Sequence, residues 1–159
     1  EIRYQAGDYR GAVDLFRQAA NLNPAKYAYI GYLGDALQAD PATASKAHAA
    51  YATAAAQARQ FVDMKPDDAI AVAMLGWYRA NLGEHDEAVR LAERAERLKL
   101  EPGEVAFYGA RTYALLGERG KAQRRLGDAR AAGVPERRIM ADTTLIGAGL
   151  VAKGPSQAR

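Results

Sequence analysis

The chain has 159 residues, of which 49% are hydrophobic and 26% are charged, and its formal net charge is +3. This composition provides enough apolar side chains for the core of one ordinary domain, so nothing requires the chain to be disordered. The absence of cysteine excludes disulfides, thiolate metal sites and a cysteine nucleophile. It is compatible with reducing and oxidising compartments alike, so the localisation is unknown.

The apolar segments of the chain are short. Uninterrupted stretches such as residues 145–152 fall far below the roughly 20 residues that a membrane-spanning helix needs, so we expect no membrane span. The chain begins without an initiator methionine and without a basic segment followed by an apolar one. We therefore expect it to be a piece of a longer protein.

Helical periodicity begins at the start of the chain. Alanine is the commonest residue, and the six prolines fall between periodic segments, which favours helices over strands. The fold class is therefore predicted to be all-α. Residues 1–26 supply the second helix of an incomplete helix-turn-helix unit.

Residues 27–68 carry a longer version of the same unit. Gly76 lies seven positions further from Ala47 than Gly34 lies from Ala12, so seven extra residues lie in or after the second helix. Such an insertion is nearly two helical turns long and keeps the apolar residues on one face. We predict one extended helix over residues 41–64, capped at its start by Asp40.

Residues 69–102 and 103–134 repeat one another at a constant offset. Each pairs two amphipathic helices around a glycine, and the offset places Gly83 on Gly117. Such periods are typical of stacked helix-turn-helix units, which cannot bury their apolar faces alone. The chain is thus expected to contain about four units in one array.

The repeated residues resemble a known family. Aligned on its small and aromatic positions, the first unit resembles the tetratricopeptide repeat through Gly7, Asp8, Tyr9, Ala12, Phe16, Ala19 and Pro24. The later units continue the resemblance through Leu33, Gly34, Leu75, Gly76, Tyr113, Gly117 and Ala122. The resemblance implies a right-handed α-α superhelix. The glycines at mid-helix positions 34 and 76 each cost about 1 kcal/mol in helix propensity, which predicts close helix packing there.

After Gly133 the residues typical of the repeat are lost, although helical spacing continues. We predict a C-terminal capping helix within residues 135–152, whose spacing resembles the end segments of tetratricopeptide arrays in bacterial signalling proteins. Residues 1–152 are thus expected to form a single helical-repeat domain. Residues 153–159 are expected to form a tail.

Residue patterns typical of catalysis are lacking. One of the two histidines, His85, lies in the turn "GEHDEA", where acids near a helix start are favoured by the helix dipole. The segment "GERGKA" at residues 117–122 lacks the spacing of a phosphate-binding loop. We therefore expect the chain not to be an enzyme, and to have no catalytic residues, cofactor or metal site.

The family resemblance also implies a concave groove lined by the first helix of each unit. The residues expected to face it are Tyr4, Gln5, Asp35, Gln38, Ile70, Trp77, Asn81, Glu104, Phe107 and Arg111. Aromatic residues and arginine often anchor interfaces, so we hypothesise an aromatic step of Trp77 and Phe107. Arg111 would then recognise an acidic group of a peptide. The competing interpretation is that these aromatic rings pack against neighbouring helices or a capping element.

The sequence therefore predicts a protein-protein interaction scaffold that binds a peptide or partner surface of unknown identity. The alternative is a regulatory or dimerisation module of a larger protein, for example a bacterial signalling protein. It would contact that protein or a second copy through the helix at 41–64 and the basic segment at 119–138, which has seven basic and two acidic residues. Nucleic acid is the less favoured partner, because the units lack recurrent base-contacting side chains.

Overall fold

The computed structural model describes residues 2–152, and all regular structure within them is helical. The elements are α1 (Ile2–Gln5), α2 (Tyr9–Leu22), α3 (Tyr27–Ala39), η1 (Ala44–Lys46), α4 (Ala47–Met64), α5 (Ala69–Asn81), α6 (His85–Leu98), α7 (Pro102–Leu115), α8 (Arg119–Ala131), α9 (Glu136–Met140) and α10 (Thr143–Gly147). Here η1 is a short 3-10 helix. The all-α fold class is thereby confirmed, while the predicted tail at 153–159 lies outside the described residues.

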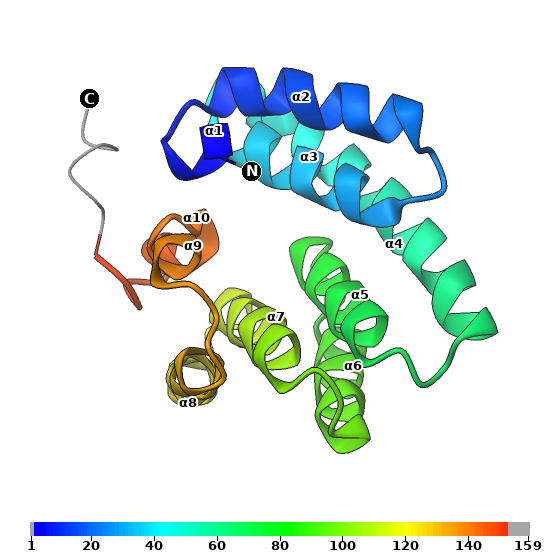
Figure 1. The fold of residues 1–159 in the computed structure, drawn as a ribbon, viewed down its shortest axis with the longest axis vertical. Helices are drawn as coiled ribbons and strands as arrows, with labels where there is room; N and C mark the ends of the chain where they lie inside the picture. The colour runs from blue at the N-terminus through cyan, green and yellow to red at the C-terminus, as the bar shows by residue number, and fades with distance from the viewer. Residues whose placement is uncertain (1, 153–159) are drawn as a thin grey trace.

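Helices that follow one another along the chain pack against each other. The pairs α3 and α4, α5 and α6, and α7 and α8 are each in contact, and α5 also packs against α7 (Figure 1). The last helices leave this order: α10 packs against α7, and α9 and α10 lie near α1 in Figure 1. The first and last described helices are therefore neighbours in space.

The turn between α5 and α6 and the turn between α7 and α8 share one backbone conformation. Gly83 and Gly117 have φ values of +78° and +74°, a region that glycine enters without steric cost. In both turns the N–H of the following glutamate donates to the carbonyl five residues earlier, at 2.9 Å. This bond closes the helix end in the manner of a Schellman turn. The repeat in the sequence is thus also a repeat in backbone structure.

The mid-helix glycines lie where two helices come closest. A Cβ atom at Gly34 would stand 2.7 Å from the ring of Tyr51, which lies on α4. A Cβ at Gly76 would stand 3.2 Å from Leu91 Cβ and 3.3 Å from the Ala88 carbonyl oxygen, both on α6. Close helix packing at both positions was predicted from the sequence and is confirmed.

The extended helix is present, and its end at Met64 agrees with the prediction. Met64 lies seven positions further from Ala47 than Leu98, the end of α6, lies from the equivalent Ala88. The seven extra residues therefore lie at the end of α4. The face formed by Ala47, Tyr51, Ala54 and Ala58 is buried in the core, as its spacing predicts.

The predicted start of this helix at residue 41 is wrong, because α4 begins only at Ala47. The Asp40 side chain does not cap a helix but accepts the N–H of Ala42 at 3.0 Å, two residues on. The Thr43 hydroxyl donates to the Leu37 carbonyl at 3.0 Å and so closes a turn against the end of α3. These local hydrogen bonds hold residues 41–43 in a turn, and η1 then leads into α4.

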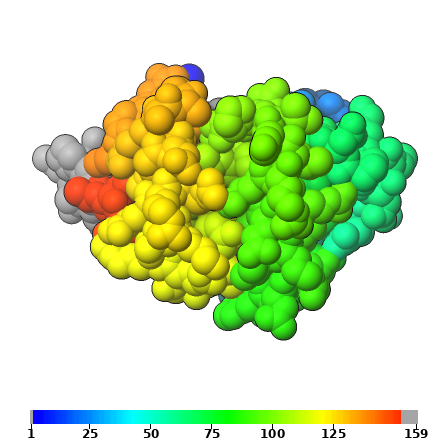
Figure 2. All heavy atoms as spheres, turned by 90° about the horizontal axis from the view of Figure 1, so that it is seen from below, coloured from blue at the N-terminus to red at the C-terminus, as the bar shows by residue number. Residues whose placement is uncertain are grey.

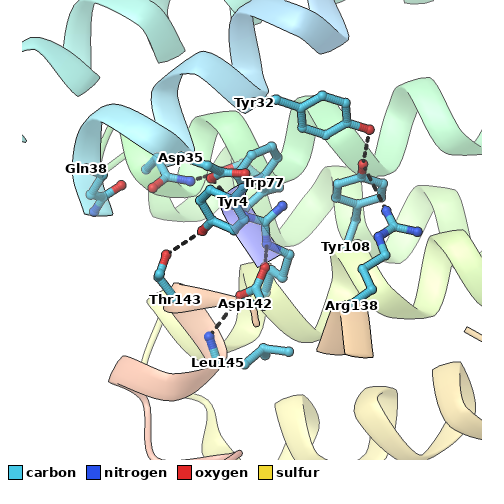
Figure 3. A network of polar contacts seen from close by, with 12 residues as sticks. Tyr4, Tyr32, Asp35, Gln38, Trp77, Tyr108, Arg138, Asp142, Thr143 and Leu145 are labelled. Carbon is cyan, nitrogen blue, oxygen red and sulfur yellow. Dashed lines mark hydrogen bonds and ion pairs between the residues drawn. The ribbon is translucent and has the colours of Figure 1, made fainter. Parts of the chain in front are cut away.

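The C-terminal cap consists of two short helices instead of the single helix expected. Helix α9 ends at Met140, and Asp142 then accepts the N–H of Leu145 at 3.0 Å, which starts α10 as a separate helix (Figure 3). Ile139 on α9 and Leu145 on α10 have no exposed surface. The two helices therefore bury apolar side chains at the C-terminal end of the described residues.

A large apolar core connects the helices, and Ala92, Tyr113 and Ala122 form a second, smaller cluster. The buried residues of the large core run along the chain from Ala12 on α2 to Val151 beyond α10. Figure 2 shows the outer surface that encloses it on one side, where the yellow of α8 lies beside the green part of the chain and the blue-green of α4 lies beyond. Within residues 2–152 every helix is too short or too polar to cross a bilayer, in agreement with the sequence prediction.

Candidate functional site: a cleft between α3 and α7

A cleft with a volume of about 190 Å³ lies between helices from the two ends of the described chain. It is lined by Tyr4, Gln5, Phe16, Tyr32, Asp35, Glu104, Phe107, Arg111, Arg138 and Asp142. These residues come from α1, α2 and α3 on one side and from α7, α9 and the start of α10 on the other. Six of the ten residues predicted to face a groove are among them.

The lining separates into a floor and a rim. Asp35, Phe107, Arg111 and Asp142 are buried and form the floor. The other six side chains are half-buried and form the rim. Charged groups buried this deeply must be paired to remain charged, so the floor is organised by its ion pairs.

Arg111 lies at the centre of the floor between two carboxylates. Its Nη2 donates to Asp35 Oδ1 at 2.8 Å, and its Nε lies 2.9 Å from Asp142 Oδ2. The guanidinium lies over the indole of Trp77, with 3.6 Å between Cζ and the ring centroid.

Burial and pairing act in opposite directions on these groups. Burial alone would lower the pKa of Arg111, but Asp142 and Asp35 outweigh it and hold the pKa above the usual value. Burial, together with the charge of Asp142, raises the pKa of Asp35 to about 6 against the opposing effect of Arg111. The Tyr51 hydroxyl also donates to Asp35, at 2.9 Å.

A second guanidinium forms part of the rim. Arg138 donates to both carboxylate oxygens of Glu104, at 2.5 and 3.0 Å, and its Cζ lies 4.3 Å from the centroid of Phe107. Its Nη2 also reaches the hydroxyl of Tyr108 at 3.4 Å, and that hydroxyl lies 3.1 Å from the hydroxyl of Tyr32 (Figure 3). Burial alone would lower the pKa of Arg138, but the hydrogen bonds to Glu104 hold this pKa above the usual value.

One hydrogen bond joins the rim of the cleft to α10. The Tyr4 hydroxyl lies 2.8 Å from Thr143 Oγ1, and the two residues are 139 positions apart in the chain (Figure 3). Tyr4 is half-buried at the rim, and Thr143 begins α10. The cleft is thus shaped jointly by the first and the last described helices.

The structure does not contain the accessible aromatic step expected from Trp77 and Phe107. Trp77 has no exposed surface, and the exposure of Phe107 is 2%. The indole of Trp77 is enclosed by the rings of Tyr51 and Tyr108 and by the guanidinium of Arg111. The competing interpretation, in which these rings pack against neighbouring helices, describes Trp77 correctly. The acidic groups that Arg111 contacts belong to its own chain.

Besides Trp77, three other predicted groove residues lie outside the cleft lining. Gln38 is exposed on α3, where its Oε1 lies 2.9 Å from the Tyr51 hydroxyl oxygen. Ile70 is half-buried at the start of α5 and packs against the core. Asn81 ends α5, and its Nδ2 donates to the carbonyl of Trp77 at 3.0 Å.

Four lining residues were not predicted as site residues: Phe16, Tyr32, Arg138 and Asp142. Two of them lie in the C-terminal segment, which lacks the residues typical of the repeat. A signal for Asp142 was present, because an aspartate followed by two threonines and an apolar residue is a common helix start. Nothing local connects that residue with the groove.

The basic C-terminal segment is largely paired within the chain. Lys121, Arg125, Arg130 and Arg138 form ion pairs with glutamates or an aspartate. Arg119 donates to the carbonyls of residues 148 and 149 at the end of α10, at 2.6 and 2.9 Å. Five of the seven basic side chains therefore have partners in the chain itself.

The histidines and acids of the described chain do not assemble a metal centre. Among residues 2–152 no group of three or more histidine and acidic side chains could hold a metal ion. His48 and His85 are both exposed. No protein-family model and no curated protein matches the sequence.

Proposed function

We propose that the chain is a protein-protein interaction module that holds a segment of a partner protein at the cleft between α3 and α7. Its architecture would be a right-handed superhelix of tetratricopeptide type. The equivalent turns at Gly83 and Gly117 and the close packing at Gly34 and Gly76 support that architecture. Repeat arrays of this kind use their extended surfaces for binding.

The observation that carries this proposal is the pre-formed cleft. Its volume of about 190 Å³ is smaller than the roughly 300–1,000 Å³ of typical small-molecule sites, so it suits one side chain of a partner. The ion pairs of Arg111 fix its floor, and the rim offers the rings of Phe16 and Tyr32, whose centroids are 5.6 Å apart. Rigid aromatic groups around a pocket are typical of interface anchors.

A cross-linking experiment tests the proposal. The protein carries photo-reactive benzoylphenylalanine in place of Tyr32, and the cross-linked partner is identified by mass spectrometry and then purified. Its affinity is measured by calorimetry for wild type, Phe16→Ala and Leu15→Ala. Leu15 is the matched control, since it lies beside Phe16 on α2 and is 47% exposed without lining the cleft.

We expect Phe16→Ala to weaken binding at least about tenfold, whereas Leu15→Ala changes it less than about twofold. Circular dichroism must show the same helicity for all three proteins. Equal affinity of the two variants for the partner would contradict binding at the cleft.

The alternative function, self-association or docking on a parent protein through α4, has one feature in its favour. Met64 at the end of the α4 extension is 74% exposed, beside the half-buried Phe61. Sedimentation equilibrium of wild type and Met64→Lys decides between the two. A dimer that the substitution dissociates would support the alternative, and a monomer at all concentrations would count against it.

A further inference from the structure

The charges that line the cleft are unbalanced. Asp35, Glu104 and Asp142 supply three carboxylates, whereas Arg111 and Arg138 supply two guanidiniums. The remaining five lining residues are uncharged. With all five charged groups ionised the lining therefore has a net charge of −1, although the whole chain has a charge of +3.

Neither guanidinium is available to an anion. Arg111 lies between Asp35 and Asp142, at 2.8 and 2.9 Å, and one of its faces is covered by a ring. Arg138 makes two bonds to Glu104 at 2.5 and 3.0 Å. An incoming carboxylate would have to break these pairs and leave a buried or half-buried acid without its partner, which is strongly unfavourable.

The rings of the lining suit a cation. Tyr4, Phe16, Tyr32 and Phe107 are all aromatic, and the face of an aromatic ring attracts cations. The cleft already uses this chemistry internally, because Arg138 lies 4.3 Å from the centroid of Phe107 while it pairs with a carboxylate. A ring together with a carboxylate thus already holds a guanidinium at the rim.

We infer that the cleft accepts a cationic side chain of the partner protein, a lysine or an arginine, between its carboxylates and its aromatic rings. This inference rests on the proposed function and names the chemistry of the partner. It reverses the polarity expected from the sequence, in which Arg111 was to recognise an acidic group. Arg111 instead orients the two carboxylates of the floor.

Three small probes that differ only in their side chains test the inference. They are the Nα-acetyl N-methylamides of lysine, norleucine and glutamate, titrated into ¹⁵N-labelled protein and followed by two-dimensional NMR. We expect saturable shifts at residues around the cleft for lysine, with an affinity about tenfold higher than for the neutral norleucine probe. Equal binding of lysine and norleucine, or tighter binding of glutamate, would overturn the inference.

Two variants change the charge of the ion pair between Glu104 and Arg138 in opposite directions. Glu104→Gln removes the excess negative charge and is expected to weaken lysine binding about tenfold. Arg138→Gln increases the excess and frees a face of Phe107, so lysine binding should be at least as tight as in wild type. Well-dispersed NMR spectra show that each variant is folded. Loss of lysine binding in Arg138→Gln would also overturn the inference.

The probe titrations test the cationic specificity of the cleft, and the partner experiment tests the proposed function. Either claim can be refuted while the other is supported. If a partner's affinity depends on Phe16 but the cleft does not prefer lysine, the proposed function is supported and the cationic specificity is refuted. If the cleft prefers lysine but no partner's affinity depends on Phe16, the cationic specificity is supported and the proposed function is refuted.

Discussion

The guanidinium of Arg111 lies over the indole of Trp77, with 3.6 Å between Cζ and the ring centroid. The stack joins α7 to α5, and the carboxylates of Asp35 and Asp142 join the same guanidinium to α3 and to the start of α10. Four segments of the chain thus meet at one side chain whose exposure is only 2%.

Replacing Arg111 by methionine should therefore lower the free energy of unfolding by about 3–5 kcal/mol, because two buried carboxylates lose their partner. Urea unfolding followed by the fluorescence of Trp77 measures this loss. Arg124→Met is the control, since Arg124 is exposed, and it should change stability by less than about 0.5 kcal/mol. A loss below about 1 kcal/mol for Arg111→Met would show that the floor tolerates unpaired acids.

The raised pKa of Asp35 predicts an unusual pH dependence. Its pKa of about 6 in the folded protein exceeds the ordinary value of 3.8, so the folded state binds this proton more tightly than the unfolded state. The contribution of Asp35 to stability is therefore largest below pH 3.8 and is lost as the pH rises through 6. The charged groups facing it are Arg111 and Asp142, and the hydroxyls are those of Tyr51 and Tyr4.

Comparison with Asp35→Asn isolates this effect from the other titrating groups. The stability of wild type relative to the variant should increase by about 2 kcal/mol between about pH 7.5 and about pH 4.5. Urea unfolding of both proteins across this range provides the measurement. A stability difference that stays constant with pH would mean that Asp35 titrates near its ordinary pKa.

Alanine substitutions of two helical glycines should change the free energy of unfolding in opposite directions. Gly34→Ala should destabilise the protein by about 1–3 kcal/mol, because the new Cβ would stand 2.7 Å from the buried ring of Tyr51. Gly127→Ala on α8 meets nothing within 4 Å and should stabilise it by about 0.5–1 kcal/mol through helix propensity. Thermal and urea unfolding check both changes, and a stable Gly34→Ala protein would refute tight packing of α3 on α4.

The hydrogen bond between Tyr4 and Thr143 can be measured by a double-mutant cycle. Tyr4→Phe and Thr143→Val each remove one hydroxyl, and the coupling free energy should be about 1 kcal/mol. Additive effects of the two substitutions on the free energy of unfolding would show that α1 and α10 are not coupled through these hydroxyls.

The features predicted correctly from the sequence are those set by local pattern and spacing. The turns at Gly83 and Gly117, the close packing at Gly34 and Gly76 and the extension at the end of α4 all follow from the period of the repeat and its one interruption. In each case the deciding contacts lie within one helical pair or between neighbouring pairs.

The accessibility of Trp77 could not be predicted in the same way. Helix α5 packs against α4, α6 and α7, so it has almost no free face and its residues from Ala71 to Tyr78 are all buried. Periodicity shows which side of a helix is apolar but not how many neighbours cover it. The partners of Arg111 were hidden for a related reason, because Asp142 belongs to a segment outside the repeat pattern.

The contacts of Thr143 and Asp142 with α1 and α7 also affect how the protein unfolds. In a linear array each unit contacts only its neighbours, so the terminal helices can open alone at little free-energy cost. Here, opening of α9 and α10 would also break the bond to Tyr4 and leave Arg111 with one carboxylate. Amide hydrogen exchange in α1, α7 and α10 should therefore report one shared opening event. The first and last described helices should lose their structure together, and not separately from the ends inwards.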